Sequence, residues 1–126
     1  MRKIITTDQA PKAVGPYSQA VRYGNLLFLS GQVSINPEND EIEKGTVKEQ
    51  TKRTLTNIKA VLEAAGSGID QVLKCNVYLA DINNFNEMNE VYRAFFSSDY
   101  PARLCVSGVD IYGGIAVEID VIAAVE

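Results

Sequence analysis

The 126-residue chain contains no histidine. This absence excludes Ser/His and Cys/His nucleophile pairs, the usual zinc ligand sets, and the imidazole acid–base catalysis that is common in metal-free ribonucleases. Any chemistry must therefore use arginine, lysine, carboxylates, hydroxyls, thiols, backbone groups and water.

Cysteine is also scarce, since Cys75 and Cys105 are the only two in the sequence. Each lies within an apolar, strand-like run, where a buried free thiol is more typical than one member of a disulfide framework. We therefore expect both thiols to be reduced.

The chain has neither an excess of positive charge nor a long apolar run. Its 12 Lys and Arg against 16 Asp and Glu give a net charge of −4, dispersed along the chain. This balance argues against nucleic acid as the main partner. No stretch is long enough to span a bilayer, and residues 1–21 lack the apolar core of a signal peptide. We expect a cytoplasmic protein with no membrane partner.

No repeat, low-complexity segment or linker interrupts the sequence. Hydrophobic residues make up 46% and charged residues 22%, as in ordinary soluble globular chains. A length of 126 residues suits one compact domain that needs no disulfide or structural metal. We therefore expect residues 1–126 to form a single domain.

The first half of the chain predicts a β-hairpin followed by a helix. β-favouring residues flank Gly24-Asn25, a dipeptide that tolerates positive φ. Residues 36–41, "NPENDE", are typical of a loop. Thr46 and Glu49 match a capping box, and Gly66 is a natural stop after residues at helical spacing.

The second half alternates strands with one more helix. Residues 71–80 read as a central strand, and the next sixteen residues return to helical period with an aromatic stripe that favours core packing. Two further strands follow Pro101, and in the last one apolar and acidic residues alternate. The order of elements predicts an α+β domain with helices on one face of a sheet.

Arg103 and Glu118 stand out because each is a charged residue with an apolar neighbour on both sides in a strand segment. An unpaired buried ion is very costly, so they could pair with each other or occupy exposed strand positions. The functional interpretation is that the guanidinium fork binds a substrate carboxylate while the glutamate directs water at a carbon.

Four other residues have weaker signals. Tyr17 precedes the first predicted strand and is, on its own, typical of a half-buried turn residue. Ser30-Gly31 ends the strand in "LLFLSGQ" and could admit a ligand close to the backbone, although on its own the dipeptide favours an ordinary bend at a strand end. Cys105 leaves the same strand face as Arg103, but with no histidine to activate it we favour a small packing residue over a nucleophile.

Taken together, the segments resemble the Rid family of reactive intermediate deaminases, also called YjgF proteins or, in older usage, L-PSP endoribonucleases. The resemblance covers essentially the whole chain, in the family's order and near its spacing. It rests on "APKAVGPYSQAV", "LLFLSGQ", "GTVKEQTKRTLTNIKAVLEAAG", "VLKCNVYLADINNFNEMNEVYRAFF", "YPARLCV" and "VEIDVIA".

The resemblance implies a chorismate-mutase-like fold with a mixed β-sheet, assembled as a homotrimer with three clefts between subunits. It further implies hydrolysis of enamine and imine intermediates, which dehydratases that use pyridoxal phosphate release, to 2-oxo acids and ammonia. No metal or organic cofactor is implied. Two alternatives stay open: a ribonuclease that inhibits translation, and a non-catalytic trimer that binds small carboxylates.

Residue by residue, the resemblance makes Arg103 the carboxylate-binding arginine and Glu118 the residue that positions water. It also identifies the cleft-lining residues Tyr17, Ser30, Gly31 and Cys105. Asn89 matches a recurrent asparagine, to which we assign local hydrogen bonding rather than catalysis.

The chain also departs from the family pattern. Ile111-Tyr112 replaces the common Leu-Pro and is followed by Gly113-Gly114, while the glycine often found near Asp40 is missing. Ser107-Gly108 replaces bulkier residues. These changes concern the substrate side-chain range and the contacts between subunits.

Overall fold

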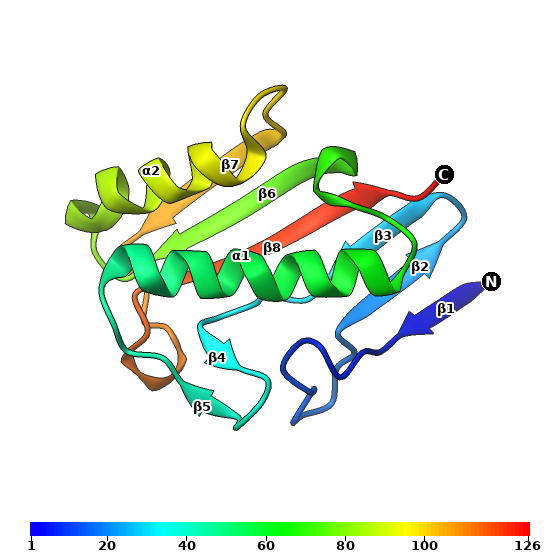
Figure 1. The fold of residues 1–126 in the computed structure, drawn as a ribbon, viewed down its shortest axis with the longest axis horizontal. Helices are drawn as coiled ribbons and strands as arrows, with labels where there is room; N and C mark the ends of the chain where they lie inside the picture. Colours follow the sequence, from blue (N-terminus) through cyan, green and yellow to red (C-terminus); the bar gives the residue numbers. More distant parts are fainter.

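The computed structural model describes all residues 1–126 and consists of a six-stranded sheet covered by two helices (Figure 1). The strands are β1 (Arg2–Ile5), β2 (Ala20–Tyr23), β3 (Leu26–Leu29), β4 (Ile35–Asn36), β5 (Glu41–Ile42), β6 (Val72–Leu79), β7 (Ala102–Ser107) and β8 (Val117–Ala124). The helices are α1 (Val47–Ala64) and α2 (Phe85–Phe96), with short 3-10 turns at Ile69–Gln71, Ile82–Asn84 and Tyr112–Gly114.

The sheet order is β1-β2-β3-β8-β6-β7. All neighbours pair antiparallel except β6 and β7, which are parallel because α2 lies in the connection between them. The sheet is therefore mixed, as the resemblance implied. The last strand, β8, occupies a central position between β3 and β6.

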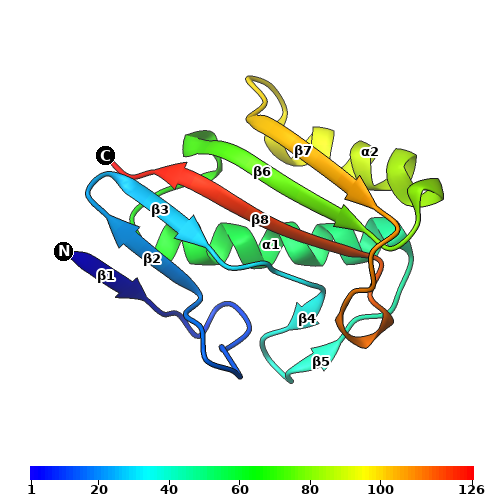
Figure 2. The same cartoon turned by 180° about the vertical axis from the view of Figure 1, so that it is seen from behind.

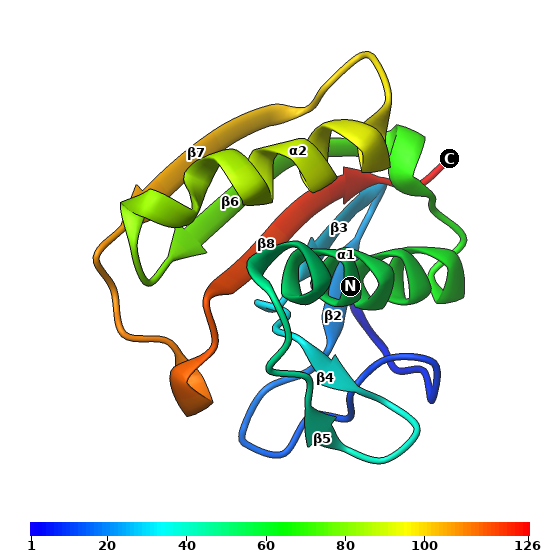
Figure 3. The ribbon, with the colours of Figure 1, turned by 60° about the vertical axis from the view of Figure 1, so that its left-hand side comes forward.

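Both helices lie on the same face of this sheet, which confirms the α+β prediction. Figure 1 shows α1 crossing β8 and α2 running beside β6 and β7, whereas Figure 2 shows the other face without a helix in front of it. In the turned view of Figure 3, both helices again lie in front of the strands. Along β8, residues 117, 119, 121 and 123 are buried beneath the helices, and the intervening residues face the open side.

The capping-box prediction for α1 is confirmed in detail. The Glu49 amide donates to the Thr46 hydroxyl at 3.2 Å, and the Thr46 amide donates to the Glu49 carboxylate at 2.9 Å. At the other end Gly66 adopts a φ of +80°, the left-handed conformation that ends a helix. The predicted hairpin also forms, with Gly24 at φ +59° between β2 and β3.

Sequence reasoning missed the short strands. β1 is a four-residue edge strand, and β4 and β5 are two-residue strands that form a separate small ladder. The "NPENDE" loop connects β4 to β5, and in it Asp40 takes a φ of +61°. The family often carries a glycine near this position, and Asp40 adopts the positive φ that glycine favours.

The aromatic stripe on α2 is buried, but not quite as expected. Met88 and Tyr92 lie in the core with Phe96, while Phe85 and Phe95 are only partly buried. Neither helix is long and apolar enough to cross a membrane.

Candidate active site

Arg103 lies on the edge strand β7, and its side chain faces the helices. It pairs in register with Cys75 of β6, which is completely buried beneath them. Because residues in register on neighbouring strands point to the same side of a sheet, the guanidinium is directed toward α2. The edge position leaves it open to solvent.

Three side chains of α2 hold the guanidinium. Arg103 Nη1 donates a 2.7 Å hydrogen bond to Asn89 Oδ1, and its Cζ lies 4.7 Å from the centroid of the Tyr92 ring and 5.6 Å from that of Phe85. Cation–π contacts and one hydrogen bond fix the plane of the fork, while the other N–H groups stay available to a ligand. Asn89 thus has the local hydrogen-bonding role expected from the sequence.

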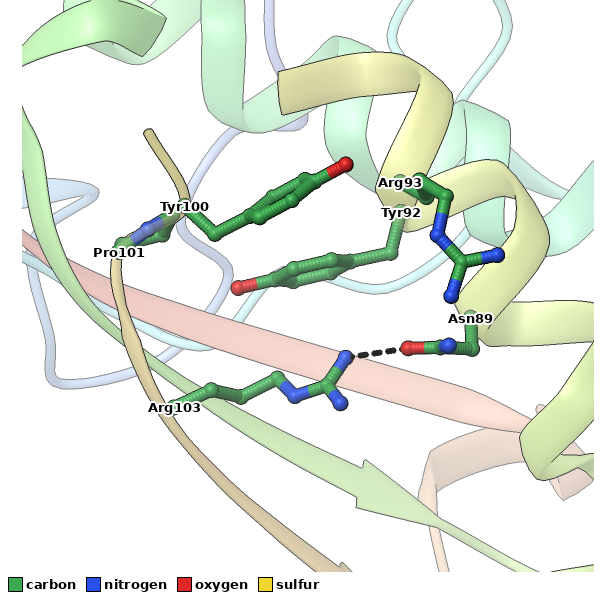
Figure 4. A pocket seen from close by; sticks show the side chains of 6 residues that line it. All are labelled: Asn89, Tyr92, Arg93, Tyr100, Pro101 and Arg103. Atoms are coloured by element: carbon green, nitrogen blue, oxygen red, sulfur yellow. Dashed lines mark hydrogen bonds between the residues drawn. The ribbon is translucent and has the colours of Figure 1, made fainter. Parts of the chain in front are cut away.

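Arg103 lines a pocket of about 390 Å³ between α2 and the start of β7 (Figure 4). Its lining residues are Asn89, Tyr92, Arg93, Tyr100, Pro101 and Arg103. Two of these carry a positive charge and none carries a negative one, so the pocket favours an anion.

Cys105 is on the same strand face as Arg103, as predicted. It pairs with the buried Val77 and packs against the core. Burial raises the pKa of the Cys105 thiol, although the nearby Arg103 charge acts in the opposite direction. The thiol is therefore neutral near pH 7 and suits a packing role better than that of a nucleophile. Both cysteines are free, which confirms the prediction of reduced thiols.

Glu118 lies on the opposite face of the sheet from Arg103. Its neighbours in β8, Val117 and Ile119, are fully buried on the helix side, so the Glu118 side chain extends from the open side. Burial raises the pKa of its carboxyl, and the Asp120 charge two residues along the same face raises it further. A carboxylate with a raised pKa is a better proton acceptor for water than an ordinary surface glutamate.

Gly31 lies directly against this carboxylate. Backbone hydrogen bonds between Gln32 and Ile119, of 2.8 and 3.1 Å, hold the two segments together. A Cβ added at Gly31 would overlap Glu118 Oε2, so any larger residue would displace the carboxylate from this position. Close approach, rather than an unusual φ, is what requires glycine here.

Ser30 and Tyr17 lie near the same end of the sheet. The Ser30 hydroxyl donates a 2.6 Å hydrogen bond to the carbonyl of Ser18, which fixes the segment that follows Tyr17. Tyr17 itself is half exposed and lines a second pocket of about 200 Å³ together with Gly31 and Tyr112. The departure at residues 111–114 therefore lies beside this second pocket.

The structure thus divides the predicted site residues into two groups. Arg103 and Cys105 face the helices at one edge, while Glu118 and Gly31 are on the open side, with Tyr17 beside Gly31. The suggested ion pair between Arg103 and Glu118 does not form, because the two side chains leave opposite faces of the sheet. The ion pairs are instead Lys12–Asp40, Lys48–Glu90 and Arg53–Glu43.

Sequence reasoning missed the residues that complete the arginine pocket. Tyr92 belongs to the aromatic stripe that the sequence predicts to pack in the core, and it does so, but the face of its ring also contacts Arg103. Sequence reasoning did not identify Arg93 or Tyr100 as site residues. The spacing of four residues between Asn89 and Arg93 does indicate that their side chains lie on the same surface of the helix. No three Cys, Asp or Glu side chains converge as a metal site.

Comparisons with known proteins identify relatives that match over nearly the whole chain. The family model described as Endoribonuclease L-PSP matches residues 7–125. A RutC family protein of Pyrococcus abyssi is 48% identical over 122 residues, which cover 97% of this chain and 96% of that protein. The 2-iminobutanoate/2-iminopropanoate deaminase of Bos taurus is 44% identical over 123 residues, covering 98% of this chain and 90% of its own.

The fold is shared as well. The crystal structure of Escherichia coli TdcF with bound serine superposes with a TM-score of 0.94 at 38% identity, covering 98% of this chain and 99% of that one. The mixed sheet with two helices on one face is therefore the fold of these neighbours. By sequence and by structure, the chain belongs to the Endoribonuclease L-PSP family, which is also the YjgF/RutC/Rid family.

Proposed function

We propose that this chain hydrolyses 2-iminobutanoate, 2-iminopropanoate and their enamine tautomers to 2-oxo acids and ammonia. The observation that carries the proposal is the Arg103 guanidinium, which Asn89 and Tyr92 hold in a pocket without acidic residues. Relatives named as deaminases of these imines at 38–44% identity support the assignment. So does the serine-bound neighbour, because serine is a small carboxylate.

The chemistry requires only groups that the chain itself supplies. Arg103 binds the substrate carboxylate through its guanidinium fork. The enamine tautomerises to the imine, and Glu118 accepts a proton from water as the water oxygen bonds to C2. The imine nitrogen takes up that proton, which gives the neutral carbinolamine. The carbinolamine hydroxyl then loses its proton as the amine gains one, the C–N bond breaks, and ammonia departs, leaving a carbonyl at C2. Positioning supplies most of the effect, and we propose that no metal or organic cofactor takes part.

A coupled assay tests this function. A threonine dehydratase generates 2-aminocrotonate, and the formation of 2-oxobutyrate is timed with and without the protein. We expect acceleration that is proportional to the concentration of the protein. Binding of 2-oxobutyrate by calorimetry without any acceleration would instead identify a carboxylate-binding module, and RNA cleavage abolished by Glu118→Ala would identify a ribonuclease.

We further propose that the active unit is a homotrimer with sites between copies. Glu118 and Arg103 are on opposite faces of the sheet, so a substrate bound to Arg103 of one copy needs the glutamate of another. The open face also exposes apolar side chains that a partner would cover. These include Phe28, Leu104 and Val106.

Mixing two inactive variants tests the shared site. Arg103→Ala and Glu118→Gln copies are unfolded together, refolded at equal concentration and assayed. If each site takes one residue from each of two neighbouring copies, random trimers regain about a quarter of the wild-type activity, because one site in each mixed trimer is intact. Activity no higher than that of either variant alone would show that both residues act from the same copy.

A further inference from the structure

Arg93 is the second charged residue in the Arg103 pocket, and no acidic side chain pairs with it. The ion pairs of the structure do not include Arg93, and the adjacent Glu90 is bound by Lys48 of α1 at 3.0 Å. The side chain is exposed. Its guanidinium is therefore free to bind a ligand.

Arg93 and Arg103 lie on either side of the Asn89 side-chain amide in this pocket. Arg93 follows Asn89 by one helical turn on α2, so their side chains emerge on the same surface of the helix. Figure 4 shows the Arg93 and Arg103 side chains approaching Asn89 from different elements, α2 and β7, with the Tyr92 ring beside them. Two guanidinium forks thus border one cavity of about 390 Å³.

Two like charges around one cavity repel each other, and a single bound carboxylate neutralises only one of them. A ligand with a second anionic group would neutralise both. Each guanidinium matches the planar geometry of a carboxylate, and imines derived from acidic amino acids carry a carboxylate at each end. A side-chain carboxylate would meet Arg93 once Arg103 holds the carboxylate next to the imine.

We propose that Arg93 is a specificity-determining residue that binds the side-chain carboxylate of diacid imines such as 2-iminosuccinate and 2-iminoglutarate. The inference rests on the proposed deaminase function and names a further substrate class for the same site. Amino-acid oxidation, which converts an amine to an imine, is the class of reaction that would supply these substrates.

The competing explanation is structural. Arg93 lies in the last turn of α2, where a cation interacts favourably with the helix dipole. That role would affect the stability of the helix and would change the turnover of monoacid and diacid imines alike. The two explanations therefore differ in substrate selectivity.

The experiment compares two imines in one assay. L-aspartate oxidase supplies 2-iminosuccinate, an L-amino-acid oxidase acting on alanine supplies 2-iminopropanoate, and the loss of each imine is followed by trapping with semicarbazide. The readout is the kcat/KM for the diacid divided by that for the monoacid. We expect this ratio to fall about 10- to 100-fold in Arg93→Gln, as for loss of a charge-assisted hydrogen-bonded pair. Arg93→Lys should restore part of it.

Lys59→Gln is the matched control, because it removes one positive charge from the exposed surface of α1 away from this pocket. Its ratio should equal that of the wild type. An unchanged ratio in Arg93→Gln overturns the proposal. Glutamine is a good helix former, and a thermal melt of each variant checks that α2 is intact.

A failure of the deaminase function can be distinguished from a failure of this inference. If the wild-type protein hydrolyses neither imine, calorimetry with 2-oxoglutarate and 2-oxobutyrate replaces the assay. A preference of the wild type for 2-oxoglutarate that is lost in Arg93→Gln would support the dicarboxylate site in a protein without deaminase activity. Equal affinity for both oxo acids would contradict it.

Discussion

Replacing Arg103 by alanine should reduce kcat/KM for 2-iminobutanoate by about 30- to 5,000-fold. Truncating one member of a hydrogen-bonded charge pair typically costs about 2–5 kcal/mol of binding, and each 1.36 kcal/mol corresponds to a factor of about ten. Arg103→Lys should recover little, since an ammonium lacks the fork and the flat surface that lies against Tyr92. The measurement is the coupled dehydratase assay over a range of protein concentrations.

Folding should survive the Arg103→Ala change. The side chain is exposed on an edge strand, so losing its hydrogen bond to Asn89 and its contact with Tyr92 should cost only about 1 kcal/mol of stability. Arg2→Ala is the control, because Arg2 is an exposed arginine on β1, the strand at the opposite edge of the sheet. If Arg103→Ala keeps the activity of the Arg2→Ala control, Arg103 does not bind the substrate.

Glu118→Gln should lower kcat by about 10²- to 10⁴-fold, the usual contribution of a positioned proton acceptor. Glutamine has nearly the same shape and fits against Gly31, so the backbone near the site should not move. Wild-type activity should fall as the pH is lowered through the Glu118 pKa, which burial and Asp120 place above its ordinary value of 4.5. The residual activity of Glu118→Gln should not show this decrease at low pH.

Glu118→Gln should lower activity but leave the thermal stability of the protein unchanged or slightly raised at pH 7. A carboxyl whose pKa is raised in the folded state favours the protonated form, so its contribution to stability is greatest at low pH and is lost as pH rises through the folded pKa. At pH 7, Glu118→Gln should therefore melt at a temperature equal to or slightly above that of the wild type. The difference should shrink below pH 4.5. Lower stability together with lower activity would indicate a structural defect instead of a missing proton acceptor.

Local patterns in the sequence predicted local structure well. The Thr46–Glu49 capping box located the start of α1, Gly24 located the hairpin turn, and strict alternation assigned the buried face of β8. Each of these features depends on residues within a few positions of one another. Backbone and side-chain geometry over such a short range is nearly independent of the rest of the chain.

Relations between distant strands could not be predicted in the same way. Alternation shows that Arg103 and Cys105 lie on one face of β7, and that Val117 and Ile119 lie on one face of β8. It does not show whether these two faces are on the same side of the sheet. Only the pairing of both strands with β6 reveals that Glu118 and Arg103 point in opposite directions. The contact between Arg103 and Asn89 likewise depends on how α2 packs against the sheet.

The central position of β8 has a consequence for the order of folding. The meander β1-β2-β3 and the pair β6-β7 belong to one sheet only because β8 lies between them. Pairing β8 with β3 joins Phe28 to Ile122 and closes a loop of about three-quarters of the chain, which is entropically costly and slow compared with forming the local hairpin or α1. We therefore expect β8 to dock late and its amides to exchange hydrogen only through global unfolding, while those of β1 exchange through local opening.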